Sequence, residues 1–253
     1  MIRIAAAGDL HFGTDSAGTL GPSLERLPEQ ADLFLLAGDL TKWGDPKEAD
    51  VLGHEVAGVP VPKVAVLGNH DYHLGKHGAV TASMERAGVR VLEGESEVLE
   101  VDGSRIGVAG VKGFGGGFVG ACATEFGEPE MKAFVAHTRL TAGRLEEALA
   151  SLEGVDLRIA LLHYSPIEAT LMGERPEIYP FLGSYLLAES IDRVGADLVL
   201  HGHAHLGQEA GTTPGGIPVR NVSQHVIKRA YNVYSFSDDR AHPEKVGSAH
   251  DVR

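Results

Sequence analysis

KVAVLGNHD, residues 63–71, is the stretch that decides the fold. A short and mostly apolar run, residues 63–67, ends at once in Gly68-Asn69-His70-Asp71. An apolar run of this length, bounded by a turn residue, is typical of a buried strand in a parallel sheet. The three polar side chains after Gly68 therefore fall at the carboxyl end of a predicted strand.

The same succession of an apolar run and a polar cluster recurs four times. The runs are residues 2–7, 33–37, 159–162 and 198–200, and they lead into Gly8-Asp9-Leu10-His11, Gly38-Asp39, His163 and His201-Gly202-His203-Ala204-His205. Ligands of open α/β sheets bind at the carboxyl ends of the strands. A single Asp-x-His pair is a common turn or helix cap, but five polar clusters at the same end of five strands predict a metal site.

Helical patterns lie between the predicted strands. Asp45-Pro46 is an N-cap followed by a first-turn proline, residues 80–87 suit a short helix that ends at Gly88, and another helix begins at Ser184. The longest helix is expected over residues 130–152. Its inner face would consist of Phe134, His137, Thr141, Leu145, Ala148 and Leu152. Alternating strands and helices predict an α/β fold with parallel strand pairing.

Two regions break this alternation. Residues 98–101 and 106–111 flank Asp102-Gly103, which is a signal for a tight hairpin. Residues 217–222 and 230–236 read as two late strands with no helix between them. A purely parallel sheet is therefore not expected, and a mixed or two-sheet core is.

The length and composition are those of a globular protein. The 253 residues fit one large domain or two small ones, and 43% hydrophobic with 23% charged residues excludes a disordered chain. Because residues 237–253 turn polar, we expect one domain over residues 1–236 and a loose C-terminal tail. The net charge of −13 argues against a broad surface for nucleic acid or anionic membranes, which would need clustered Lys and Arg.

The sequence shows neither a membrane-spanning segment nor a signal peptide. No run approaches the roughly 18 apolar residues that a membrane-spanning helix needs. The apolar stretch at the start is too short before its first acid to be a signal peptide, so the cytoplasm is expected.

Cys122 is the only cysteine, which excludes an intrachain disulfide and a cysteine-rich zinc site. It lies among small residues, so we expect it to pack rather than to act as a nucleophile.

The candidate ligands identify the kind of metal. They are Asp9, His11, Asp39, Asn69, His163, His203 and His205. Imidazole and carboxylate without thiolate suit Zn, Mn, Fe or Co. Seven ligands are too many for one tetrahedral ion, but they fit two divalent ions about 3.5–4 Å apart that share a carboxylate.

The order of the clusters resembles the signature of the calcineurin-like metallophosphoesterases. Their blocks are Asp-x-His, Gly-Asp with a later Gly, Gly-Asn-His-Asp, a lone His and Gly-His-x-His, and all five occur here in order between Asp9 and His205. The resemblance implies a four-layer α/β/β/α sandwich of two mixed β-sheets flanked by helices. The second Asp that many members carry inside the Gly-Asp block is missing from residues 38–44.

The resemblance also implies a role for each residue of the site. Asp9, His11 and His205 would hold the first ion, Asn69, His163 and His203 the second, and Asp39 would bridge both. His70 would face the substrate as a catalytic residue rather than a ligand, and Asp71 would orient its ring.

Such a site predicts a phosphoesterase. A water that bridges the two ions would lose a proton near neutral pH and attack phosphorus, while His70 would stabilise the growing charge and protonate the leaving alkoxide. A phosphodiester of a small soluble substrate such as a nucleotide is favoured, and a phosphomonoester is possible. Nucleic acid and membrane are not expected partners, and the oligomeric state is open.

Two other functions stay open. One is a binding or scaffold protein that keeps the fold without catalysis, and the other is a regulatory subunit that binds a nucleotide without cleaving it. The presence of all seven ligands and of His70 argues against the binding or scaffold protein. The regulatory subunit would show tight nucleotide binding and no product.

A few residues outside the blocks carry weaker signals. Gly115, Gly117 and Gly120 match the dinucleotide fingerprint, but no helix opens directly after them, so we expect a loop with a possible role as a lid. Tyr72 and His73 are candidates to line the pocket. Lys42 is a candidate phosphate contact, and His201 is expected to be structural. The remaining histidines are expected on the surface or in the core; they are His54, His77, His137, His225, His242 and His250.

Overall fold

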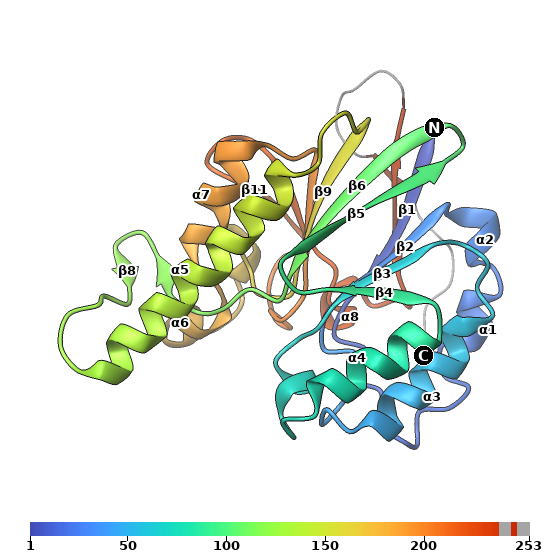
Figure 1. Cartoon of the computed structure of the whole chain (residues 1–253), viewed down its shortest axis with the longest axis horizontal. Helices are drawn as coiled ribbons and strands as arrows, with labels where there is room; N and C mark the ends of the chain where they lie inside the picture. The colour runs from blue at the N-terminus through green and yellow to red at the C-terminus, as the bar shows by residue number, and fades with distance from the viewer. Residues whose placement is uncertain (238–243, 247–253) are drawn as a thin grey trace.

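Two six-stranded sheets pack face to face with helices on their outer sides (Figure 1). The computed structural model describes residues 1–237 and 244–246. The layers have the order helix, sheet, sheet, helix. The predicted four-layer α/β/β/α sandwich of two mixed sheets is therefore confirmed.

The first sheet has the order β14-β13-β1-β2-β3-β4. Its parallel strands are β1 (Ile2–Ala7), β2 (Leu33–Ala37), β3 (Lys63–Val66) and β4 (Val89–Leu92). At the other edge, β13 (Asn232–Phe236) pairs antiparallel with β1, and β14 (Glu244–Val246) pairs antiparallel with β13. The polar tail predicted over residues 237–253 lies mostly outside the described residues, and β14 falls within it.

The second sheet has the order β11-β12-β10-β9-β6-β5. Its four central strands run parallel and are β6 (Ser104–Val111), β9 (Leu157–Leu162), β10 (Leu198–His201) and β12 (Pro218–Asn221). The antiparallel edges are β5 (Glu95–Val101) and β11 (Ala210–Thr212). A separate small pair consists of β7 (Gly117–Phe118) and β8 (Ala121–Cys122).

The hairpin between β5 and β6 forms where Asp102-Gly103 predicts it. Val101 pairs with Ser104, and the two residues between them have φ of +48° and +78°. Two positive φ values in a two-residue loop match the right-handed twist of the strands, which explains why Asp-Gly is favoured there.

Four helices cover the first sheet. They are α1 (Gly21–Leu24), α2 (Leu27–Gln30), α3 (Pro46–Ala57) and α4 (His77–Arg86). Asp45 caps α3 as predicted: its side chain accepts a hydrogen bond from the Lys47 N–H, and Glu48 reaches back to the cap backbone. Gly88, with φ of +77°, follows the end of α4.

The second sheet is covered by α5 (Pro129–Ala150) and α7 (Tyr185–Val194), and Ser184 caps α7. The predicted inner face of α5 is wrong in its first turns, because Val135 and Thr138 are buried there rather than Phe134 and His137. The latter two rings pack on Phe114, at centroid distances of 5.0 Å and 4.6 Å.

Short helical turns complete the chain. They are α6 (Tyr179–Leu182), α8 (Gln224–Ile227) and three 3-10 turns, η1 (His70–Tyr72), η2 (Glu168–Leu171) and η3 (Pro176–Ile178). The turn α8 lies between the two late strands, which were predicted to follow each other without a helix. The packing role predicted for Cys122 is also wrong, because the residue lies exposed on β8.

Three apolar clusters correspond to the three contacts between layers. The first, with Phe34, Leu52 and Met84, lies between α1–α4 and the first sheet. The second, with Ile4 and Ile159, lies between the two sheets. The third contains Leu145, Leu162 and Ile191 and lies under α5 and α7. The sheets are therefore buried on both faces, which explains the near-continuous apolar runs of their strands.

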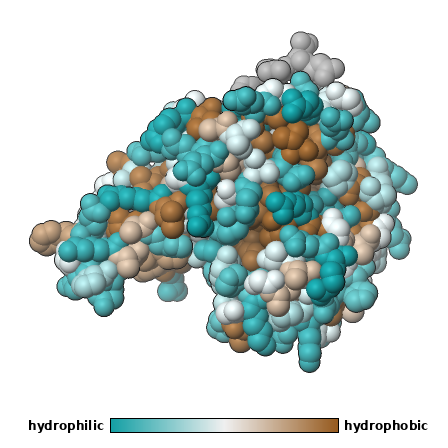
Figure 2. All heavy atoms as spheres, viewed as in Figure 1, coloured by the Kyte–Doolittle hydropathy of each residue, from teal (hydrophilic) through white to brown (hydrophobic). Residues whose placement is uncertain are grey.

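Among the described residues, no helix is both long enough and apolar enough to span a membrane. On the face seen in Figure 2, hydrophilic and apolar side chains are interspersed, and a hollow separates the part that carries α5 from the part that carries α3 and α4.

Candidate metal centre

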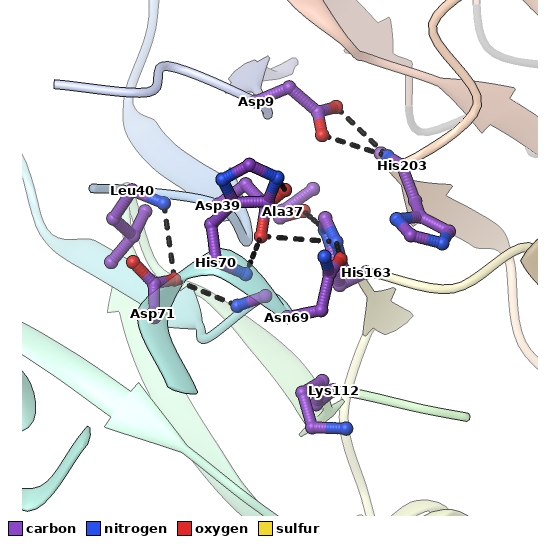
Figure 3. A network of polar contacts seen from close by, with 12 residues as sticks. Asp9, Ala37, Asp39, Leu40, Asn69, His70, Asp71, Lys112, His163 and His203 are labelled. Carbon is purple, nitrogen blue, oxygen red and sulfur yellow. Dashed lines mark hydrogen bonds and ion pairs between the residues drawn. The ribbon is translucent and has the colours of Figure 1, made fainter. Parts of the chain in front are cut away.

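All seven predicted ligand residues lie beyond the carboxyl ends of strands, and Figure 3 shows several of them converging from separate strands. Asp9 and His11 follow β1, Asp39 follows β2, and Asn69 follows β3. From the second sheet come His163 after β9, and His203 and His205 after β10. Because the two sheets present these ends at one edge of the sandwich, residues almost 200 positions apart come together.

The loops that carry the site adopt strained backbone conformations. Among the described residues, six non-glycine residues have positive φ, and four of them are Asp9, His11, Asp39 and His203, with φ between +45° and +70°. Such conformations cost about 1–3 kcal/mol each and persist only where surrounding structure enforces them. Here the His11 N–H donates to the Asp39 carbonyl at 3.0 Å, and the His203 N–H donates to the Asp9 carboxylate at 2.9 Å.

Two glycines of the motifs make room for the ligands. A Cβ on Gly68 would lie 2.1 Å from Asp39 Oδ1, and a Cβ on Gly38 would lie 2.5 Å from His163 Nδ1. Gly38 also has φ of +80°. Gly38 and Gly68 are therefore required by close approach, and Gly38 also by its backbone conformation.

One group of donors surrounds Asp9, which is 1% exposed. His205 Nε2 lies 3.1 Å from Asp9 Oδ1, and His11 Nε2 lies 3.4 Å from His205 Nε2. Asp39 completes this group, because its Oδ2 lies 3.8 Å from His11 Nε2. One ligand atom from each of the four residues lies within 4.8 Å of the others, a spacing that a single ion can bridge.

A second group of donors surrounds the other oxygen of Asp39. Its Oδ1 lies 3.3 Å from His163 Nε2, and Asp39, His163 and His203 again place ligand atoms within 4.8 Å of one another. Asn69 joins this group, because its Oδ1 lies 2.9 Å from His163 Nε2. The carboxylate of Asp39 is therefore shared by two groups of donors.

The buried charges of this centre fit bound cations. Burial raises the pKa of Asp39 to about 9, and the charges of Asp9 and Asp71 contribute to the increase. Among the described residues, the ion pairs of Asp9 and Asp39 involve histidines and no Lys or Arg. Carboxylates crowded in a dry site need a compensating positive charge, which divalent ions would supply.

The histidines are prepared to act as neutral ligands. Burial lowers the pKa of His11 and of His203 to about 4, and lowers that of His163 well below its usual value. His205 differs: burial lowers its pKa, but the hydrogen bond to Asp9 and the charge of that residue outweigh this effect and raise it. Neutral imidazole is the form that binds a metal.

Hydrogen bonds from the outer side fix which ring nitrogen faces the centre. His163 Nδ1 lies 2.9 Å from the Ala37 carbonyl oxygen, and because a carbonyl only accepts, Nδ1 carries the proton. The lone pair of His163 Nε2 then faces the oxygens of Asp39 and Asn69. Three electron-rich atoms that point at one another form a donor set that a cation stabilises.

His70 lies beside this centre with its ring partly exposed. Its N–H donates to Asp39 Oδ1 at 2.9 Å, and its Nδ1 donates to the Lys42 carbonyl at 2.8 Å. Its Nε2 lies 3.9 Å from Asp39 Oδ2. The ring is thus oriented by the backbone of the loop after β2, and Nε2 is the nitrogen turned toward the donor groups.

The predicted contact between Asp71 and the ring of His70 is wrong. The buried Asp71 carboxylate accepts hydrogen bonds from Leu40 N, Gly68 N, and both N and Oγ1 of Thr41, at 2.6–3.1 Å. These donors belong to the loop after β2 and the turn after β3. Asp71 therefore joins the two segments that carry Asp39 and Asn69.

Other predicted candidates have mixed outcomes. His201 is structural, since its ring nitrogens contact the Gly202 carbonyl at 2.7 Å and Thr170 Oγ1 at 2.8 Å. Tyr72 stacks on His77 at 4.3 Å, and its hydroxyl donates to Glu93. The glycine-rich residues 113–120 form a loop that contains the short strand β7. Backbone hydrogen bonds tie it to residues 180 and 183, which argues against a freely moving lid.

Sequence reasoning missed two residues near the centre. Lys112 Nζ lies 5.2–5.3 Å from the ring centroids of Tyr72, Phe114 and Tyr164. Lys112 directly follows β6, and β6 runs parallel to β9, which ends before His163. Its position at the carboxyl end of a strand could therefore have predicted that it lies near the centre. His225 stacks on His205 at 4.0 Å, and no pattern in the sequence pointed to it.

The comparisons with known proteins agree with this architecture. A curated "Uncharacterized metallophosphoesterase" of Aquifex aeolicus (strain VF5) is 36% identical over 101 residues, and the match spans 38% of this chain and 37% of that protein. The solved structure of TT1561 of Thermus thermophilus is similar with a TM-score of 0.60 and 22% identity, over 92% of this chain and 93% of that one.

A phosphopantetheinyl hydrolase (PptH) from Mycobacterium tuberculosis is similar with a TM-score of 0.58 and 17% identity, over 87% of this chain and 88% of that one. At these identities the structures support the fold alone. The family model "Calcineurin-like phosphoesterase" matches residues 2–207. The chain belongs to the calcineurin-like phosphoesterase family.

Proposed function

We propose that the protein hydrolyses phosphate esters with two divalent metal ions. The observation that carries the proposal is the position of Asp39, whose two carboxylate oxygens face separate groups of donors. Asp9, His11 and His205 would hold one ion, Asn69, His163 and His203 the other, and Asp39 both. Mn, Fe and Zn suit this mixture of imidazole, carboxylate and amide.

Two divalent ions held there would supply positive charge for an anionic phosphate and would lower the pKa of a nearby water. The chain fixes the donors before substrate arrives. Asp71 joins the loops that carry Asp39 and Asn69, and the Ala37 carbonyl fixes the tautomer of His163. Prearranged ligands avoid a reorganisation cost during the reaction.

His70 is assigned to the leaving group. Its Nδ1–H is fixed on the Lys42 carbonyl, so Nε2 is free to hold a proton on the side of Asp39. A protonated Nε2 can donate to a phosphoryl oxygen or to the departing alkoxide. The partly exposed ring remains accessible to a substrate that enters from solvent.

A small phosphodiester with an aromatic group, such as a nucleotide, suits the surroundings of His70. Trp43 is 50% exposed, and its ring centroid lies 6.5 Å from that of His70 and 5.4 Å from that of His73. A flat group attached to the leaving oxygen would find an aromatic surface there. The net charge of −13 does not favour a long nucleic acid.

The proposal is tested by the turnover of bis(p-nitrophenyl) phosphate beside p-nitrophenyl phosphate. Metal-free protein is reloaded with Mn²⁺, Fe²⁺ or Zn²⁺ in separate samples. Faster cleavage of the diester supports the phosphodiesterase assignment, and faster cleavage of the monoester reverses it. Two bound ions without turnover of either ester, or of a panel of nucleotides, would favour the binding or scaffold function instead.

A further inference from the structure

A histidine outside the motif blocks lies at the edge of the candidate metal centre. His225 is on α8, and the backbone just before it is fixed to the loop that carries Asp9. The Gly8 N–H donates to the Val222 carbonyl at 2.8 Å, and the Gln224 N–H donates to the Gly8 carbonyl at 2.9 Å. The position of His225 relative to Asp9 is therefore set by two short backbone hydrogen bonds.

The ring of His225 contacts two proposed ligands. It stacks on His205 with a centroid distance of 4.0 Å and an interplanar angle of 8°, and its centroid lies 5.9 Å from that of His11. One ring nitrogen from each of these three histidines lies within 4.8 Å of the other two. The three imidazoles thus form a donor group that overlaps the group around Asp9. Because stacked rings hold their lone pairs in parallel planes, the exposed ring of His225 would turn out of the stack to share an ion with His205.

Other histidines outside the blocks are engaged elsewhere. His54 contacts the Asp50 carbonyl oxygen at 2.6 Å, His77 stacks on Tyr72, and His137 packs on Phe114. Within the part of the chain that the structure describes, the ring of His225 makes no hydrogen bond, so its nitrogens are free to bind a cation.

We infer that His225 is an additional ligand of the ion assigned to Asp9, His11 and His205. This inference rests on the two-ion centre of the proposed function. The neutral imidazole donates a lone pair, and no bond of the chain is made or broken. The motif blocks do not include this residue, which reaches the centre from the turn between the two late strands.

The consequence is that the two ions differ in their donors. The first ion would have three imidazoles and two carboxylates, one of them shared, whereas the second would have two imidazoles, one amide and the shared carboxylate. Additional imidazole favours Zn and Fe over Mn. The first ion is therefore expected to be held more tightly, and removal of His225 should reduce that difference.

The test uses three single variants of the full chain. His225→Ala removes both the ring and its nitrogens, and His225→Phe keeps a flat ring against His205 but offers no lone pair. His54→Ala is the matched control, because it removes an exposed histidine from α3 outside the centre. Circular dichroism of each metal-free variant checks that the fold is retained.

Metal affinity is measured by titration with Zn²⁺ alone, and the ligand set is followed by the visible spectrum of Co²⁺-loaded protein. Both His225 variants should bind the first ion at least about tenfold more weakly than the wild type, in line with effects of removing groups near a metal. Their Co²⁺ spectra should change, and His54→Ala should match the wild type in both measurements.

Several outcomes would overturn the inference. If His225→Phe binds both ions like the wild type and its Co²⁺ spectrum is unchanged, the histidine only packs on His205. An equal loss of affinity in His54→Ala would assign the effect to something other than ligation. Failure of the proposed function would be recognised separately. A wild type that binds two ions but hydrolyses no ester would contradict that function, and the metal titration would still test the role of His225.

Discussion

Asp39 faces His11 with one carboxylate oxygen and His163 with the other. Oδ2 lies 3.8 Å from His11 Nε2, and Oδ1 lies 3.3 Å from His163 Nε2. His11 lies after a strand of the first sheet and His163 after a strand of the second, so this single side chain connects the donors of both sheets. Both proposed ions would therefore depend on one carboxylate.

Replacement of Asp39 should affect both ions at once. Asp39→Ala removes the shared carboxylate, and we expect the affinity for both ions to fall. Loss of a group that only contacts a ligand lowers metal affinity about 10–100-fold, and loss of a direct ligand should have a larger effect. Turnover should fall below detection. Metal content after dialysis measures this, with Asp45→Ala, which removes only the cap of α3, as the control. A variant that keeps two tightly bound ions would disprove the shared role.

His70→Ala should separate catalysis from metal binding. The ring of His70 is held by the Lys42 carbonyl and is not among the grouped donors. We expect full metal content and a decrease in kcat of about 10²–10⁴, which is typical of the loss of an acid or base catalyst. A loss of one ion would show that His70 is a ligand instead.

Asp71 should matter for stability more than for the orientation of His70. Asp71→Ala leaves two buried N–H groups of the loop after β2, the Thr41 hydroxyl and the Gly68 N–H without an acceptor. We expect a loss of about 3 kcal/mol or more in the free energy of unfolding, measured by urea denaturation of metal-free protein. Unchanged stability with a large loss of turnover would restore a role in orienting His70.

Trp43 should contribute to the binding of aromatic esters. Base stacking on an aromatic side chain contributes about 1–3 kcal/mol, so Trp43→Ala should raise KM for a nucleotide diester by about tenfold and leave a dimethyl or other alkyl diester unaffected. Trp43 is the single tryptophan, so its fluorescence in the wild type reports binding directly. An equal rise in KM for alkyl and nucleotide esters would contradict a contact between Trp43 and the aromatic group of the substrate.

The Arg3–Asp32 pair should stabilise the fold above acid pH. Burial alone would raise the pKa of Asp32, but hydrogen bonds from Arg3 lower it below its usual value. The pKa of Asp32 is lower in the folded protein than in the unfolded chain. The stabilisation is therefore fully present above about pH 4 and is lost as the pH falls through the folded pKa. The difference in unfolding free energy between the wild type and Asp32→Asn should therefore shrink with acidification. A constant difference between pH 7 and pH 3 would contradict this.

The strand ends were predictable from sequence because each combines two local signals. A run such as residues 63–67 must be apolar when the sheet is covered on both faces, and Gly68 is needed because a side chain would overlap Asp39. The cap at Asp45 and the hairpin at Asp102-Gly103 are also local, since their chemistry depends on backbone groups within a few residues.

Features that depend on distant packing were not predictable. Periodicity alone could not show that Val135, rather than Phe134, faces the core, because Phe114 provides a separate contact for the latter. His225 came close to the centre only through the pairing of residues 222–224 with Gly8. The partners of Asp71 likewise depend on two loops meeting in space.

Two ions joined by Asp39 should act together in ester hydrolysis. The decisive measurement is the turnover of bis(p-nitrophenyl) phosphate by metal-free protein during stepwise addition of Mn²⁺. If both ions are needed, turnover rises until two equivalents per chain are bound and then stays constant. A plateau at one equivalent, or two bound equivalents without turnover of any phosphate ester, would contradict a two-ion mechanism.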